Sequence, residues 1–200
     1  GEYLAKFHGA DFQAIQNDPE LYAFAIAGGK AAFKDNCATC HGSGGAGGPG
    51  YPNLNDDDWI WGGTTDDIYQ TLKYGIRSGN PDARESMMPA FGEVLSEQEI
   101  GQVADFVLTL HTGVNDQLPG YAVFQENCAA CHGEDGHGIR EMGAPNLSDA
   151  IWLKSDGSKG AIMSQIKNPQ HGVMPAWVDR LDDDTIRQLT VYVHSLGGGE

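Results

Sequence analysis

The pattern C-x-x-C-H occurs twice in this 200-residue chain, and it constrains the possible folds more than any other feature of the sequence. It is formed once by Cys37, Cys40 and His41, and again by Cys128, Cys131 and His132. The chain has 4 cysteines, so every cysteine belongs to the pattern and none is left for a disulfide framework. One chemistry, used twice, must therefore account for all of them.

The two motifs belong to a longer duplication. GKAAFKDNCATCHG from Gly29 aligns with GYAVFQENCAACHG from Gly120 at an offset of 91 residues. Downstream, the sequence PNL, a tryptophan, Met-Pro-Ala and a final amphipathic segment recur in the same order, which indicates a tandem repeat. We therefore predict an N-terminal linker over residues 1–22, a first domain over 23–115 and a second domain over 116–200.

Apolar spacing predicts about three helices in each repeat: one that runs into the motif, a middle helix and a terminal helix. The middle helices are expected over residues 66–74 and 161–167. The first terminal helix is expected to begin at Ser96, because Glu99 has the spacing of a capping box. The apolar faces of the terminal helices are Ile100, Val103, Phe106, Val107 and Leu110, and Ile186, Leu189, Tyr192, Val193 and Leu196. Strand signals are weak, so the predicted class is mostly α with long glycine-rich loops.

Two cysteines three positions apart, with a histidine directly after the second, are typical of covalent haem attachment. Each thiol adds to a haem vinyl group, and the histidine supplies the proximal iron ligand. A zinc ribbon usually has its paired motifs ~15 to 20 residues apart, and a thioredoxin-like dithiol needs a βαβ setting. We therefore predict two haem c groups, attached through Cys37, Cys40, Cys128 and Cys131 and ligated by His41 and His132. Haem would also fill a core that such small, glycine-rich repeats cannot build alone.

The sixth iron ligand is expected to be a methionine that precedes a proline. Met88 lies 47 residues after His41, and Met174 lies 42 residues after His132. Proline favours extended backbone at the residue before it, and an extended loop can carry a sulfur atom across the haem face. Met87 is the alternative to Met88, which we prefer because it shares the following proline with Met174.

Two further side chains bear on the predicted haem sites. Arg77 is a candidate partner for a haem propionate, because a guanidinium group binds a carboxylate through two hydrogen bonds. The second repeat has no arginine at the corresponding position. His171 is the only histidine close to a predicted ligand loop, and we interpret it as an ordinary surface histidine.

The chain is strongly acidic, with 28 acidic and 12 basic residues and a net charge of −16. This balance argues against nucleic-acid binding, because phosphate recognition needs clustered lysine and arginine. It favours solubility, and it also suits the steering of a basic partner toward a docking face. No run approaches the ~18 consecutive apolar residues of a membrane span, and the first residues lack the layout of a secretory signal. We therefore expect the printed chain itself to be soluble.

Three features together identify a family: GYPNLNDDDWIWGG at residues 50–63, IRSGNPDARESMMPAFG at residues 76–92 and the pair of C-x-x-C-H motifs. Each repeat resembles a class I c-type cytochrome. The whole, from about residue 17 to the end, resembles the dihaem subunit III of cbb3-type cytochrome c oxidases. The DDDW-WGG segment is more specific than C-x-x-C-H, which many unrelated cytochromes carry.

The resemblance implies an electron-transfer module on the periplasmic side of the bacterial inner membrane, which is not an enzyme on its own. It would relay electrons from a donor cytochrome to a monohaem subunit and then to the catalytic subunit that reduces oxygen. It also implies a membrane helix upstream of the sequence given. The family's thioether cysteines, proximal histidines and distal methionines carry over to the residues named above, with Met88 and Met174 as distal ligands.

Three other functions are compatible with two such motifs. A free soluble dihaem carrier differs only in its setting. A dihaem peroxidase needs one five-coordinate haem, which methionine at both distal positions disfavours. A sensing module would require Met88 to dissociate and admit a gas.

Overall fold

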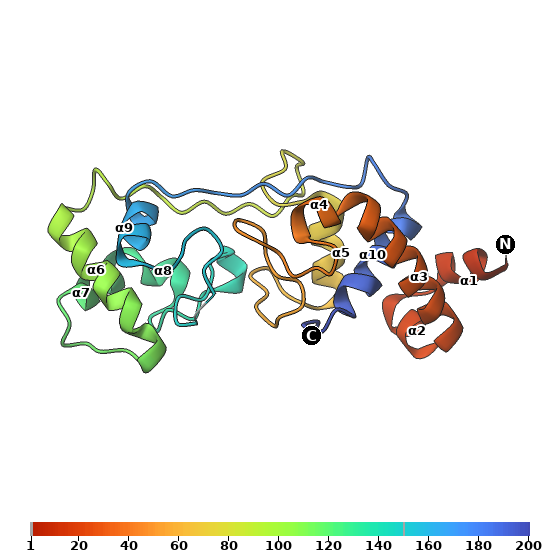
Figure 1. Cartoon of the computed structure of the whole chain (residues 1–200), viewed down its shortest axis with the longest axis horizontal. Coiled ribbons are helices and arrows are strands. Elements are labelled where there is room, and N and C mark those ends of the chain that lie inside the picture. The colour runs from red at the N-terminus through yellow and green to blue at the C-terminus, as the bar shows by residue number, and fades with distance from the viewer. Residues whose placement is uncertain (1, 150) are drawn as a thin grey trace. The chain divides into compact units, whose positions relative to one another are not determined.

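The structure is a computed structural model that describes residues 2–149 and 151–200. Over these ranges the regular structure is helical, with three isolated β-bridges and no sheet (Figure 1). The helices are α1 (Glu2–Gly9), α2 (Phe12–Asn17), α3 (Pro19–Asn36), α4 (Ala38–His41), α5 (Thr65–Tyr74), α6 (Glu97–Thr109), α7 (Gly120–Asn127), α8 (Ala129–His132), α9 (Lys159–Lys167) and α10 (Asp183–His194), with 3₁₀ turns η1 (Leu110–Thr112) and η2 (Arg140–Met142). The mostly α class predicted from the sequence is confirmed. None of the described helices is both long and apolar enough to cross a membrane.

Each C-x-x-C-H motif follows a longer helix and adds one further helical turn. Asp18 caps α3 by accepting two backbone N–H groups, and Pro19 occupies the first turn, where its missing N–H costs nothing. The helical path bends at Cys37, with φ −113° and ψ −30°, before α4 begins. It bends in the same way at Cys128, with φ −116° and ψ −35°, before α8. The two motifs therefore share one backbone conformation.

The middle and terminal helices lie close to their predicted positions. α5 and α9 begin at Thr65 and Lys159, one and two residues before the predicted starts. Ser96 and Glu99 form the expected capping box at the start of α6. The predicted apolar faces of α6 and α10 are buried, apart from Leu196, which lies beyond the end of α10 and is partly buried.

The chain divides into two compact units. In each unit, the motif helix of one repeat packs against the terminal helix of the other repeat. The first unit comprises Gly1–Arg84 and Val173–Glu200, and the second comprises Glu85–Gly172. α10, from the second repeat, packs on α3 and α5 of the first repeat, while α6, from the first repeat, packs on α7 and α9 of the second (Figure 1). The predicted division at residues 115 and 116 separates the sequence repeats, whereas each compact unit contains part of both.

A glycine allows close approach between each motif helix and its terminal helix. A Cβ atom on Gly29 of α3 would collide with the backbone carbonyl of Gln188 in α10. A Cβ atom on Gly120 of α7 would collide with the backbone carbonyl of Gln102 in α6. Gly29 and Gly120 are equivalent positions in the repeats, so one helix contact is built twice.

Each unit has an apolar core beside its motif. In the first unit, Phe33 and Cys37 pack with residues from α5 and α10, namely Ile68, Leu72, Ile186, Leu189, Tyr192 and Val193. In the second unit, Phe124 packs with buried residues from α6, η1 and α9, namely Ile100, Val103, Ala104, Phe106, Val107, Leu110, Ile162 and Ile166. The repeated phenylalanine before each motif thus anchors the motif helix to the exchanged terminal helix.

The segment predicted as a linker is helical and packed against the first unit. Phe7 and Ile15 are fully buried in a small cluster with Leu21, Ala25 and Val191 of α10. The Arg187 guanidinium on α10 donates hydrogen bonds to the backbone carbonyls of residues 7, 8 and 10. Two buried apolar side chains and a cation that satisfies three carbonyls give this segment enough contact to hold one conformation.

Replacing Gly29 with alanine is expected to destabilise the first unit, because the new methyl group must push α3 away from α10. The free energy of unfolding should fall by about 1 to 3 kcal/mol, the usual cost of overpacking. Urea denaturation of the haem-loaded chain, followed by circular dichroism, measures the change.

Gly101→Ala in α6 is the matched control, because nothing lies within 4 Å of a Cβ atom at that position. Alanine is favoured over glycine inside a helix by about 1 kcal/mol, so this variant should be neutral or stabilised. Equal stability of the two variants would contradict the close contact between α3 and α10.

Candidate haem sites

A tight loop turns the chain back toward each motif. Gly42 and Gly133 end α4 and α8 with φ values of +78° and +81°, which other residues rarely adopt. Five residues later in each loop, Gly47 N–H donates to the His41 carbonyl at 2.8 Å, and Gly138 N–H donates to the His132 carbonyl at 2.7 Å. The glycine-rich loops predicted from composition therefore have one specific, repeated fold.

This loop brings a proline carbonyl to each motif histidine. His41 Nδ1 lies 3.3 Å from the Pro52 carbonyl oxygen, and His132 Nδ1 lies 3.1 Å from the Pro145 carbonyl oxygen. A carbonyl only accepts, so Nδ1 is the donor, and Nε2 is left as the nitrogen available to a metal. Burial lowers the pKa of both histidines below the ordinary value, so both imidazoles are neutral at neutral pH.

Burial raises the pKa of the first cysteine in each motif. Burial, followed by the neighbouring Cys40, raises the pKa of Cys37 to about 11. Burial and the neighbouring Cys131 likewise raise the pKa of Cys128 to about 11. Both sulfurs are therefore neutral thiols at neutral pH rather than thiolates.

The two predicted distal methionines lie in exchanged units. Met88 and Cys128 both pack against the core of the second unit, while Met174 packs against the core of the first unit, which contains Cys37. Met87 is 69% exposed, whereas Met88 is partly buried. Of the two adjacent methionines, Met88 is thus the one that packs against the core beside a C-x-x-C-H motif.

Backbone hydrogen bonds hold the two methionine loops in matching ways. Three residues after Met88, Phe91 N–H donates to the Ile166 carbonyl at the end of α9, at 3.0 Å. Three residues after Met174, Trp177 N–H donates to the Leu72 carbonyl near the end of α5, at 3.2 Å. Each Met-Pro loop therefore docks on the middle helix of the other repeat.

A partly buried arginine in the first unit, Arg84, has an unused donor. Arg84 Nη2 lies 3.3 Å from Asp67 Oδ1, and the guanidinium carbon lies 5.5 Å from the centre of the Trp61 ring. The Nε atom is buried and has no hydrogen-bond partner among the described residues. A buried donor without a partner costs about 1 to 3 kcal/mol, so a missing acceptor is indicated at this point.

Arg84 also lies close to the first unit's methionine loop. Ile76 forms a β-bridge with Arg84 on one side and with Met174 on the other. Arg77, the residue predicted to bind a propionate, follows Ile76 with a φ of +50°, a backbone conformation that few non-glycine residues adopt. Arg77 and Arg84 both lie in the stretch that carries the family resemblance, and the prediction from the sequence named Arg77 alone.

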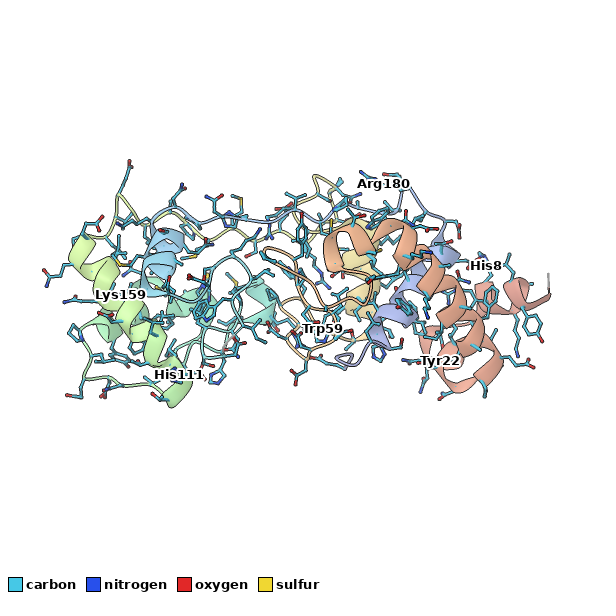
Figure 2. All side chains as sticks on the ribbon, in the orientation of Figure 1. His8, Tyr22, Trp59, His111, Lys159 and Arg180 are labelled. Carbon is cyan, nitrogen blue, oxygen red and sulfur yellow. The ribbon has the colours of Figure 1, made fainter. Side chains whose placement is uncertain are left out.

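Other neighbours of the sites were also missing from the sequence prediction. The repeated PNL sequence signalled that Pro52 and Pro145 matter, but not that their carbonyls orient the histidines. Trp59, labelled in Figure 2, donates from its indole nitrogen to the Gly198 carbonyl and so ties the C-terminal tail to the DDDW loop. No local pattern links residues so far apart in the sequence.

The residues of both units fit a covalently attached haem. Each unit offers two cysteine sulfurs in one short motif, an oriented neutral imidazole and a methionine packed on the same core. The unpartnered Nε of Arg84 adds a donor that suits a propionate carboxylate in the first unit.

Comparison with known proteins agrees with this fit. A family model described as cytochrome c oxidase, cbb3-type, subunit III matches residues 24–107 and again residues 115–193. The FixP subunit of a cbb3-type cytochrome c oxidase from Rhizobium meliloti (strain 1021) is 51% identical over 201 residues, which cover 98% of this chain and 69% of the relative. The FixPc subunit from Rhizobium leguminosarum bv. viciae is 56% identical, over 92% of this chain and 66% of the relative.

A more distant relative carries the other subunit name used in this family. The CcoP subunit of a cbb3-type cytochrome c oxidase from Azospirillum brasilense is 46% identical, over 100% of this chain and 71% of the relative. The chain thus spans about two thirds of the length of these relatives. With both repeats matched by the family model, the chain belongs to the family of subunit III of cbb3-type cytochrome c oxidases.

Proposed function

We propose that this chain transfers electrons through two haem c groups, from a donor cytochrome toward the catalytic subunit of a cbb3-type oxidase. The observation that carries the proposal is the site built twice: an attachment motif, an oriented imidazole and a Met-Pro loop on one core. The relatives are named as subunits of cbb3-type cytochrome c oxidases. The chain then works as part of a membrane-associated, oxygen-reducing complex, on the periplasmic side, and performs no substrate chemistry itself.

The proposed ligand pairs follow the compact units rather than the repeats. In the first unit, Cys37 and Cys40 attach the haem, and His41 and Met174 ligate its iron. In the second unit, the attachment residues are Cys128 and Cys131, and the ligands are His132 and Met88. The proposed pairs cross between the repeats. This is supported by the docking of each Met-Pro loop on the other repeat's middle helix.

Bound haem supplies one-electron chemistry between ferric and ferrous iron. The chain's own residues orient the imidazoles through Pro52 and Pro145 and place an apolar core beside each motif. With a histidine and a methionine both ligating each iron, the site would suit electron transfer and would not admit peroxide or a gas.

The exchange of ligands can be tested in variants that keep one haem. With Cys128 and Cys131 replaced by alanine, only the first motif attaches haem. In this background, Met174→Ala is expected to remove the sulfur-to-iron charge-transfer band and produce high-spin haem, while Met88→Ala leaves the band in place. Near-infrared and electron paramagnetic resonance spectra measure the difference. If Met88→Ala were the damaging change, the ligand pairs would follow the repeats instead.

We assign Arg84 as the partner of a propionate on the first haem, through its buried Nε. Arg84→Gln removes a partly buried positive charge from the proposed site of this haem and so favours the ferric state. The midpoint potential should fall by about 30 to 60 mV, since 59 mV corresponds to a tenfold change for one electron. A redox titration of the full dihaem chain measures it, and the second haem should not change.

Arg180→Gln is the matched control, because Arg180 is an exposed arginine of the same unit that lies 5.5 Å from the Trp177 ring. It removes the same charge from the surface, where solvent screens it. Arg77→Gln tests the competing prediction. A fall in potential with Arg77→Gln but not with Arg84→Gln would favour the residue chosen from the sequence.

The net charge of −16 supports a basic donor as partner. The rate of reduction by a basic cytochrome should fall steeply between ~10 mM and ~150 mM salt, as the Debye length shrinks from ~30 Å to ~8 Å. Stopped-flow spectroscopy measures the rate, with a neutral small reductant as the control that should not respond to salt. If the rate of reduction by the basic donor does not change with salt concentration, the negative charge of the chain serves solubility and does not steer the donor.

A further inference from the structure

The methionine loops of the two units are anchored differently at the methionine itself. In the first unit, Met174 N–H donates to the Ile76 carbonyl at 2.9 Å, and Ile76 N–H donates to the Met174 carbonyl at 3.0 Å. These two bonds form a backbone bridge that is independent of either side chain. The position of Met174 is therefore held by the main chain.

The second unit uses a side chain for the same purpose. Met88 N–H donates to Nε2 of His171 at 2.9 Å. To accept this bond, Nε2 must carry no proton, so the imidazole is present as the neutral tautomer with its proton on Nδ1. A histidine ring thus takes the place that the Ile76 carbonyl has in the first unit.

His171 is itself held in position from α9. The Gln165 side chain accepts from Gln170 N–H at 3.1 Å and donates to the Gln170 carbonyl at 3.2 Å. Both bonds fix the residue directly before His171. The same helix anchors the other end of the methionine loop, because Phe91 N–H donates to the Ile166 carbonyl at 3.0 Å. The loop that carries Met88 is therefore attached at two points that lead to α9. The attachment at Phe91 joins backbone atoms, whereas the attachment at Met88 depends on the His171 side chain.

We propose that His171 is a positioning residue for Met88, and that sulfur ligation at the second haem depends on this side chain while ligation at the first haem does not. The proposal rests on the proposed function, in which Met88 is the distal ligand of the second haem. It replaces the interpretation of His171 as an ordinary surface histidine. The family resemblance did not point to it, because the contact joins residues 83 positions apart.

The test compares His171→Leu with His171→Gln in the full dihaem chain. Leucine removes the acceptor, whereas glutamine offers a carbonyl oxygen in its place. One hydrogen bond lost at Met88 N–H should make displacement of the sulfur about three- to tenfold easier. Titration of the ferric protein with free imidazole should therefore show a three- to tenfold lower apparent Kd at the second haem in His171→Leu, and most of the change should be reversed in His171→Gln.

Each haem is followed separately by proton nuclear magnetic resonance. In the ferric state the unpaired electron shifts the ε-methyl signal of an iron-bound methionine strongly upfield, and Met88→Ala and Met174→Ala assign the two signals. His111→Leu is the matched control, because His111 is an exposed histidine of the second unit whose Nδ1 contacts only its own helix end at Leu108. It should leave both haems unchanged.

The outcomes separate the inference from the function on which it rests. If Met88→Ala leaves both methionine signals in place, the proposed ligand set is wrong. If Met88→Ala removes one signal but His171→Leu leaves the imidazole affinity of both haems unchanged, His171 has no positioning role. Equal changes at both haems would indicate general loss of packing and would also overturn the proposal.

If His171→Leu fails to fold or to incorporate haem, a second variant, Gln165→Leu, tests the same proposal. Gln165→Leu leaves His171 in place but removes the two bonds that fix the residue before it. It should shift imidazole affinity in the same direction, only at the second haem and by less than His171→Leu. No change at the second haem in Gln165→Leu, with Gln170 released, would contradict the proposed path from α9 to Met88.

Discussion

The packing of each motif helix on a terminal helix is the contact on which the rest of the structure depends. At Gly29 and Gly120 the absence of a side chain lets the two helix backbones approach closely. Because the terminal helix comes from the other repeat in both cases, the segment before it must also pass from one compact unit to the other. The Met-Pro loops lie on these segments, so one helix contact decides which methionine shares a core with which motif.

This arrangement makes each compact unit a joint product of both repeats. The core of the first unit joins Phe33 of the first repeat to Leu189 of the second, and the core of the second unit joins Phe124 to Phe106. A repeat by itself would lack the partner for its own motif helix. Small cores gain little stability on their own, and sharing elements between repeats, with haem as filler, is one way in which short, glycine-rich segments reach a stable fold.

The helices of the two repeats are alike, whereas the loops after their middle helices differ. The two proposed haem sites differ for that reason. The first unit has a longer loop after its middle helix, which places Arg84 beside Trp61 and supplies a backbone bridge for Met174. The shorter loop after α9 supplies His171 instead. A buried guanidinium and a side-chain anchor are local features, so they change one site without disturbing the helix contacts common to both.

Local patterns were sufficient for the middle and terminal helices of both repeats. The helix α6, which Ser96 caps, is predicted by its capping box and by its single apolar face. Both patterns depend on residues within a few positions of each other. The C-x-x-C-H motif likewise contains its whole chemistry in five residues. The first residues of the chain were predicted as a linker, because Phe7 and Ile15 are too few to form a recognisable apolar period before their partner on α10 is known.

The sequence by itself determined the mostly α class, the duplication, the two haem motifs and the preference for a methionine followed by proline. Only the tertiary structure decided that the terminal helices are exchanged and that Met88 packs on the core of the second unit and Met174 on that of the first. It also showed the unpartnered Nε of Arg84 and the hydrogen bond from Met88 N–H to His171. The physical reason is that the repeats present nearly the same apolar faces and the same glycine at the contact. Either terminal helix fits either motif helix by pattern, and only packing in three dimensions selects between them.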